Sequence, residues 1–343
     1  MNGKPQILEV TPPAAIAGGE FQIRGKNFAA AQGGRPRVTF GDVEAPVVIA
    51  SDSQVIARVP EGASVGELVV RAGEQTSSAW TCELGVLIAE NVHPVGNPAV
   101  DAQGNIYTTL SGPRGQATPV SVFKIDLNYD VKPFLSDVMN ATGLAFGKDG
   151  DLYISSRHNG VVYRATPSGQ MSVYVEGMGI ATGLAFDEQG NLYVGDRQGT
   201  IFKISQERQI YVFATLEPSH AAYHLAFGPE GYLYVTGPTM STHETVYRIS
   251  PEGAVETFYR GLGRLNGLAF DAEGRLYVAA SMGGRRGVVR IGPDRKPEMF
   301  VSGPGIVGLA FTPSRSIILA ISTQPGTGAL YRLDAGIKGR PLP

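Results

Sequence analysis

The feature that most constrains this sequence is a short stretch that recurs through most of the chain. Its clearest copy, Gly-Leu-Ala-Phe-Asp-Glu-Gln-Gly-Asn-Leu-Tyr-Val at residues 183–194, indicates a strand, a tight turn and a second strand. Leu184, Ala185 and Phe186 are all apolar, which is typical of a strand packed on both faces. The copies align on their turn glycines, Gly104, Gly150, Gly190, Gly231 and Gly274, at steps of 46, 40, 41 and 43 residues. A sixth copy, residues 307–311, keeps the first strand and has a different turn.

Each repeat continues with a third strand, and five of the repeats have a fourth. The third strands lie at residues 122–125, 162–165, 201–204, 246–249, 288–291 and 330–333, and the fourth around Phe134, Tyr174, Val212, Phe258 and Phe300. Repeats of 40 to 45 residues built from short strands are typical of a β-propeller with one blade per repeat. The sixth repeat lacks a fourth strand, and residues 86–89 form an isolated strand before the first repeat. We therefore expect six blades, the last completed by residues 86–89, which leaves no open sheet edge.

Composition and charge exclude several classes of function. A formal net charge of −2 gives no electrostatic footprint for nucleic acid or for an anionic membrane. No apolar run approaches the length that spans a bilayer, and no secretory signal is visible at the N-terminus. The sequence as written therefore predicts a cytoplasmic protein, or a secreted or periplasmic one if a signal has been removed. The lone Cys82 allows no internal disulfide.

Residues 1–84 form a different unit. Short apolar strands are separated by glycine, proline and asparagine, as in Gly18-Gly19 and Phe21-x-Ile23-x-Gly25-x-Asn27-Phe28, which predicts a small β-sandwich. The order and spacing resemble the TIG (IPT) immunoglobulin-like domain, which implies a spacer or binding module. Residues 85–336 resemble NHL-repeat propellers and, more distantly, the gluconolactonase/senescence-marker-protein family. Residues 337–343 are expected to be a frayed tail.

Candidate binding residues lie where the first strand of each blade begins, because these positions ring one mouth of a propeller. Together with one residue of a neighbouring loop they are Asn97, Thr142, Thr182, Asp196, Tyr223, His224 and Asn266. The set is small and polar and pairs no nucleophile with a base, so no catalytic residue is assigned. It predicts a binding protein whose mouth takes a small polar ligand or a protein partner.

A metal-dependent enzyme is the alternative. Asn266-Gly-Leu-Ala-Phe270 resembles the segment of gluconolactonases whose asparagine is a metal ligand, which implies Asn266 as a ligand. The glutamate and aspartate of that family are missing: Asn97 and Val307 stand at those positions. Two amides would hold a divalent cation weakly, and His224 is the one histidine placed to bind zinc. We therefore expect no cofactor beyond a weakly bound divalent cation, and keep a lactonase-like hydrolase or lyase working around Asn97, His224 and Asn266 as the alternative.

Basic residues occur in two patterns. The third strands carry Lys124, Arg164, Lys203, Arg248, Arg290 and Arg332, which are expected to pack their stems between blades with their charges in water rather than converge on an anion. The loops between second and third strands carry Arg157-His158, Asp196-Arg197 and Arg285-Arg286 on one predicted face. These loops are either ordinary solvated charge or a site for an anionic or sugar-like ligand. Loops 111–120 and 236–245 are longer than their counterparts, which favours a functional role.

Overall fold

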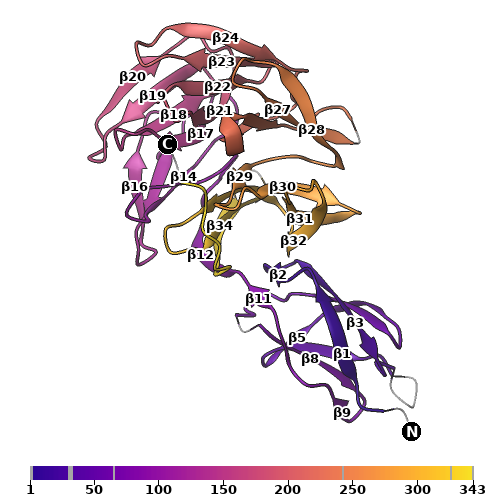
Figure 1. The fold of residues 1–343 in the computed structure, drawn as a ribbon. Coiled ribbons are helices and arrows are strands. Elements are labelled where there is room, and N and C mark those ends of the chain that lie inside the picture. Colours follow the sequence, from indigo (N-terminus) through magenta and orange to yellow (C-terminus); the bar gives the residue numbers. More distant parts are fainter. Residues whose placement is uncertain (1–2, 30–33, 65, 242, 325–326, 342–343) are drawn as a thin grey trace.

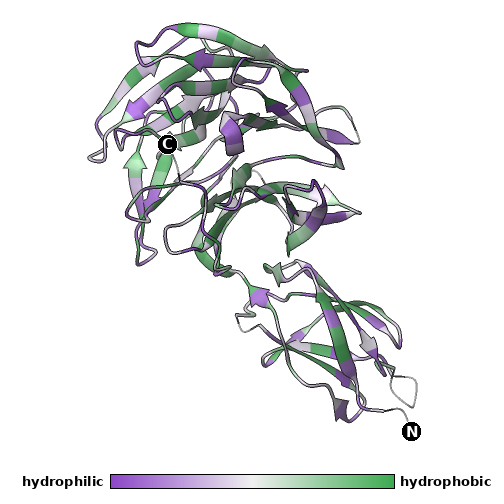
Figure 2. Ribbon diagram, viewed as in Figure 1, coloured by the Kyte–Doolittle hydropathy of each residue, from purple (hydrophilic) through white to green (hydrophobic). Residues whose placement is uncertain are grey.

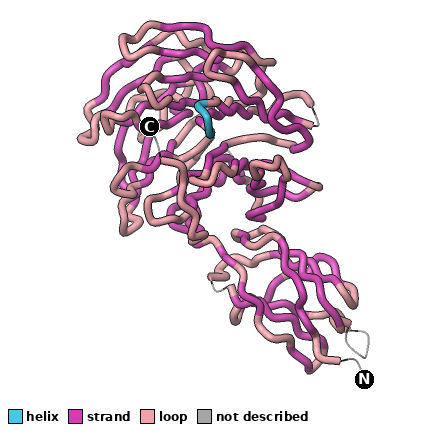
Figure 3. The backbone as a smooth tube through the Cα atoms, in the orientation of Figure 1, coloured by secondary structure: helices cyan, strands magenta, loops and turns pink. Residues whose placement is uncertain are grey.

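The computed structural model describes residues 3–29, 34–64, 66–241, 243–324 and 327–341. It contains a small N-terminal unit and a larger ring of sheets (Figure 1). Strands joined by loops make up almost the whole of both units (Figure 3). Within the described ranges the single helical element is the 3₁₀ turn Pro229–Gly231. The all-β fold class predicted from the sequence is confirmed.

The N-terminal unit is an immunoglobulin-like sandwich of two sheets. One sheet has the order β1(Gln6–Thr11), β3(Glu20–Lys26), β7(Gln54–Arg58) and β6(Val47–Ala50). The other has the order β10(Trp80–Thr81), β8(Glu67–Ala72), β4(Arg37–Phe40) and β5(Val43–Ala45), with β9(Gln75–Thr76) also paired to β8. Phe21 and Phe40 pack against each other between the sheets, with ring centroids 5.6 Å apart. Alternate residues of β4 and β8 are buried, because each strand has one face on this core.

The ring consists of six blades of four antiparallel strands each, as in a β-propeller, and the sheet of blade 5 also contains two strands from the N-terminal region. Blade 1 contains β13(Ala99–Val100), β14(Ile106–Thr109), β15(Val122–Ile125) and β16(Val131–Leu135). Blade 2 contains β17(Ala141–Phe146), β18(Leu152–Ser156), β19(Val161–Ala165) and β20(Met171–Val175). Blade 3 contains β21(Ala181–Phe186), β22(Leu192–Asp196), β23(Thr200–Ile204) and β24(Ile210–Thr215). Blades 4 and 5 are β25(His224–Phe227), β26(Leu233–Thr236), β27(Glu244–Ile249), β28(Val255–Leu262); and β29(Leu268–Phe270), β30(Leu276–Met282), β31(Arg285–Ile291), β32(Pro297–Ser302). Blade 6 is β33(Ile306–Phe311), β34(Ile317–Gln324), β35(Thr327–Leu333) and β12(Val86–Glu90).

Apolar packing between neighbouring blades holds the ring together. In blades 1 to 5, the tyrosine of the second strand meets an aromatic ring of its own fourth strand and the phenylalanine that ends the next inner strand. Tyr193, for example, lies 4.9 Å from Phe213 and 5.0 Å from Phe227 in edge-to-face geometry. Each neighbouring pair of blades shares one buried cluster, including blades 6 and 1. Apolar residues accordingly concentrate in the strands (Figure 2).

The ring is closed by strands from both ends of the propeller sequence. β12 pairs antiparallel with β35, placing Leu87 opposite Tyr331 and Ala89 opposite Leu330. Ala89 and Leu330 are buried in the cluster between blades 6 and 1. The expectation that residues 86–89 complete the sixth blade is confirmed.

The basic residues of the third strands lie along the blades and do not converge. Four of them form ion pairs within their own blade: Arg164 with Asp151 (2.5 Å), Arg248 with Glu256 (2.6 Å), Arg290 with Glu298 (2.6 Å) and Arg332 with Asp334 (2.9 Å). The ammonium groups of Lys124 and Lys203 lie over the rings of Tyr107 and Tyr193. The expectation that these six residues do not converge on one anion is confirmed.

The sandwich is joined to the outer edge of blade 5. β2(Ala14–Ala15) pairs in parallel with β32 on one side and with β11(Glu83–Leu84) on the other. The backbone N–H of Glu20 donates to Ser302 Oγ at 2.8 Å. Ile16 is 1% exposed and enters the cluster between blades 5 and 6. Main-chain pairing and a buried apolar anchor therefore fix one unit on the other.

Candidate ligand-binding channel

The inner strands β13, β17, β21, β25, β29 and β33 surround a central channel. The end of the channel where these strands begin is called the narrow end. The opposite end, where the strands finish, is called the wide end. The sequence-predicted residues lie at the narrow end. The two ends differ in how closely the inner strands approach one another.

At the narrow end, the repeated glycines bring neighbouring inner strands into backbone contact. A Cβ added to Gly183 would lie 2.4 Å from the Tyr223 carbonyl oxygen, and one on Gly308 would lie 2.3 Å from that of Gly96. No side chain fits at these separations, so the glycine of the repeat is required by close approach of the backbone. The remaining cavity is about 30 Å³, which is enough for an ordered water.

The structure brings four of the seven predicted residues together. Asn97, Thr142, Tyr223 and His224 line the small cavity, whereas Thr182, Asp196 and Asn266 do not. Thr182 Oγ1 donates to the Gly195 carbonyl at 2.8 Å and accepts from the Tyr223 N–H at 3.1 Å. The Asn266 amide donates to the carbonyl of Arg264 in its own loop.

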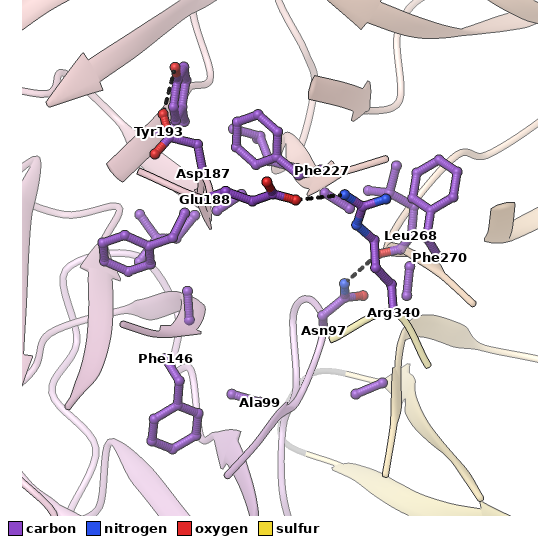
Figure 4. Close-up of a pocket in the computed structure, with 18 of the residues that line it drawn as sticks. Asn97, Ala99, Phe146, Asp187, Glu188, Tyr193, Phe227, Leu268, Phe270 and Arg340 are labelled. Atoms are coloured by element: carbon purple, nitrogen blue, oxygen red, sulfur yellow. Dashed lines mark hydrogen bonds and ion pairs between the residues drawn. The ribbon is translucent and has the colours of Figure 1, made fainter. Parts of the chain in front are cut away.

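The polar groups of Asn97 and Asp196 are occupied by the backbone. Asn97 Nδ2 donates to the Leu268 carbonyl at 2.8 Å, and Asn97 Oδ1 accepts from the Leu309 N–H at 3.1 Å (the Leu268 bond is drawn in Figure 4). This amide therefore ties blade 1 to blades 5 and 6. Asp196 Oδ1 accepts from the N–H groups of Ile180 at 2.9 Å and Gln198 at 3.2 Å, which stabilises the loop after β22.

His224 is the histidine that lines the narrow cavity. It is 5% exposed, and no described group forms a hydrogen bond with its ring. Burial lowers the pKa of His224 from 6.5 to about 4, so the imidazole is neutral at physiological pH. A neutral imidazole at a water-sized cavity can hydrogen-bond a water molecule, and it carries no orienting carboxylate of the kind that supports general-base catalysis.

The wide end contains a cavity of about 570 Å³. The ends of all six inner strands line it, including Phe146, Phe227 and Phe270 (Figure 4). The polar lining residues are Asn97, Asp187, Glu188, Gln189, Lys203, Glu230 and Arg340. The Glu188 side chain is exposed and lies at the rim. Sequence reasoning missed this cavity, although the phenylalanine that ends five of the six inner strands was an available signal.

The expectation of a frayed C-terminal tail is wrong for the residues that the structure describes. The Ala272 N–H donates to the Lys338 carbonyl at 2.8 Å, and the Arg340 N–H to that of Phe270 at 2.9 Å. The Arg340 guanidinium then reaches Glu188 of blade 3 at 3.3 Å, across the cavity (Figure 4). Gly339 lies against Phe311, where an added Cβ would lie 2.3 Å from Phe311 Cβ, so this close approach requires glycine.

Among the described residues no three His, Cys, Asp or Glu side chains form a cluster that could hold an ion. Asn97 and Asn266, the two amides considered as ligands, both donate hydrogen bonds to backbone carbonyls.

Membrane spans were also considered. Within the described ranges, none of the helical segments has the length and apolar character needed to cross a bilayer.

Comparison with known proteins agrees with the fold. Residues 5–81 match the IPT/TIG domain family, which confirms the resemblance of the N-terminal unit. No curated protein sequence matches the chain. An auxiliary nutrient binding protein from Bacteroides ovatus aligns over 97% of this chain and 98% of its own, at 12% identity and a TM-score of 0.54. A putative gluconolactonase aligns over 76% of this chain and 94% of its own, at 17% identity and a TM-score of 0.60. The calcium-binding protein regucalcin from Agrobacterium tumefaciens aligns over 76% of this chain and 96% of its own, at 17% identity and a TM-score of 0.59.

Proposed function

We propose that this protein binds a small, partly apolar ligand in the wide end of its channel, with the immunoglobulin-like domain as a fixed accessory unit and the blades as NHL-type repeats. The cavity of about 570 Å³ carries this proposal, since pockets for small organic molecules have volumes of roughly 300–1,000 Å³. Apolar walls with a few polar groups at the rim are also typical of such pockets.

The lining indicates what the ligand looks like. Leucine, alanine and phenylalanine side chains surround the centre of the cavity, so an apolar or aromatic portion would lie there. Glu188 and Arg340 lie at the rim, where polar substituents of the ligand would meet them. The neighbour named as a nutrient binding protein spans both units of this chain, and this supports a binding role.

The alternative, a lactonase-like hydrolase or lyase at the narrow end, is supported less well. Its proposed residues Asn97 and Asn266 are held by the backbone, and His224 has no orienting carboxylate. The observation that favours it is the propeller resemblance to a putative gluconolactonase, at 17% identity.

Binding can be tested with N-phenyl-1-naphthylamine, a neutral aromatic dye whose fluorescence rises in apolar surroundings. We expect saturable binding to the wild type and weaker binding to Ala269→Phe and Ala310→Phe, which fill the cavity. Ala221→Phe, on an exposed loop at the other end, is the matched control and should bind as the wild type does. Thermal unfolding checks that each variant is folded. Equal dye affinity in all folded proteins would refute the proposed site.

The alternative is tested by lactone hydrolysis with added Ca²⁺, Zn²⁺ or Mn²⁺. We expect no metal-dependent turnover. Turnover that His224→Ala and Asn266→Ala both abolish would place the protein among the enzymes.

A further inference from the structure

Three arginines lie on the narrow-end face of the propeller, in equivalent loops of adjacent blades. Arg114 lies between β14 and β15, Arg157 follows β18, and Arg197 follows β22. Burial, followed by the positive charges of Arg197 and Arg114, lowers the pKa of Arg157. The positive charges of Arg114 and Arg197 therefore repel that of Arg157.

The loop that carries Arg114 is fixed over Arg157 by Asn140. Asn140 Nδ2 donates to the Gly112 carbonyl at 2.9 Å, and Asn140 Oδ1 accepts from the Gly115 N–H at 2.8 Å. The same Gly112 carbonyl accepts from Arg157 Nη2 at 3.1 Å. The long loop at residues 111–120 is thus folded down onto the blade 2 arginine.

Arg197 is held by the loop that links β24 of blade 3 to β25 of blade 4. Its Nε donates to the Ser219 carbonyl at 3.2 Å, and the Ser219 N–H donates back to the Arg197 carbonyl at 2.9 Å. Both flanking arginines therefore belong to hydrogen-bonded loops.

The three charges have no acidic partner. Among the described residues, no carboxylate lies within ion-pair distance of Arg114, Arg157 or Arg197, whereas all four arginines of the third strands are paired. The neighbouring Asp196 uses Oδ1 to cap backbone N–H groups instead. Arg157 Nε is buried and has no acceptor. A buried charged donor without an acceptor is costly, and mutual repulsion adds to that cost.

We infer that this arginine cluster binds the oxyanion of a small ligand, a carboxylate or a phosphate group. An oxyanion would accept from Arg157 Nε, and guanidinium groups match carboxylate and phosphate geometry through paired N–H donors. It would also offset the repulsion of Arg157 by Arg114 and Arg197. This site is separate from the apolar cavity, since none of the three arginines lines that cavity.

The test is calorimetric titration at low ionic strength with inorganic phosphate, D-glucuronate and uncharged D-glucose. We expect glucose to give no heat of binding and at least one anion to bind. Arg157→Gln and Arg197→Gln should each weaken that binding about tenfold or more, because a charge-assisted hydrogen bond is lost. The matched control is Arg286→Gln, which should change affinity less than about twofold. Arg286 was expected in a loop, but it is an exposed residue at the start of β31 in blade 5, because the chain already turns at Gly283 and Gly284.

The comparison of the two anions separates a phosphate site from a carboxylate site. Absence of binding by both anions would overturn the inference, as would binding that neither Arg157→Gln nor Arg197→Gln weakens. Because N-phenyl-1-naphthylamine is neutral, its binding should be unchanged in both arginine variants, so either proposal can fail without the other.

Discussion

Acid should destabilise this protein through His224. The imidazole is buried between inner strands at the narrow end, and no described carboxylate pairs with it. Protonation in the folded state would place an uncompensated charge in a water-sized cavity, which is unfavourable. The pKa of His224 is therefore lowered from 6.5 to about 4.

The sign and size of the effect follow from proton linkage. Between pH 6.5 and about 4 the unfolded chain carries a proton at this site that the folded chain lacks, so the free energy of unfolding decreases as the pH falls. At 1.36 kcal/mol per pH unit, the whole interval corresponds to about 3 kcal/mol. Lowering the pH from neutral to about 5 should remove about 2 kcal/mol of this contribution, against a typical total of about 5–15 kcal/mol.

Two measurements test this reasoning. An NMR titration of the five histidine rings, with His224→Gln to assign the resonance, should show that His224 stays neutral to below about pH 5. Urea unfolding of the wild type and of His224→Gln should show that the variant loses about 2 kcal/mol less stability between neutral pH and about pH 5. A His224 resonance that titrates near pH 6.5, or equal acid sensitivity of the two proteins, would refute the argument.

Three further outcomes are expected. Ile16→Ala should lower the free energy of unfolding by about 2–4 kcal/mol in urea titrations, because the side chain is 1% exposed; unchanged stability would mean that the two units are only tethered. Deleting residues 85–92 should expose the edge of β35 and cause loss of cooperative thermal unfolding or aggregation on gel filtration, and a monomer of wild-type stability would contradict ring closure. Gly183→Ala should lower the thermal midpoint, since its Cβ would lie 2.4 Å from a carbonyl oxygen, and an unchanged midpoint would show that the inner strands can separate.

The ring could be predicted because its information is repeated. Each copy of the Leu-Ala-Phe and Leu-Tyr-Val segments predicts the same two strands. The last repeat lacks a fourth strand, and residues 86–89 are an extra strand that can supply it. The basic residues of the third strands were interpretable for the same reason, since equivalent residues on these outer strands lie around the periphery of the ring and cannot meet at one point.

The site was less predictable because a polar side chain at a strand end can form hydrogen bonds either with a ligand or with the protein backbone. Asn97 and Asn266 have the side chains of metal or ligand contacts, but their amides bond to backbone groups that only the folded ring brings near. The width of the channel is also invisible in sequence, since it depends on how closely glycines such as Gly183 let neighbouring strands approach. The tail at residues 337–341 has no periodic pattern. Gly339 contacts Phe311 and Arg340 pairs with Glu188, and both partners are near the tail only in the folded ring.

The attachment of the sandwich has a consequence for both proposed sites. β2 extends blade 5 beyond its outermost strand, so the sandwich lies at the circumference of the ring (Figure 1). Neither cavity includes a residue of the sandwich, so both ends of the channel remain available. β11, which pairs with β2, is followed after Gly85 by β12, which closes the ring. The attachment of the sandwich and the closure of the ring thus depend on one continuous segment, β11 to β12. Detachment of the sandwich from blade 5 should therefore weaken the pairing of β12 with β35 before it affects blades 2 to 4.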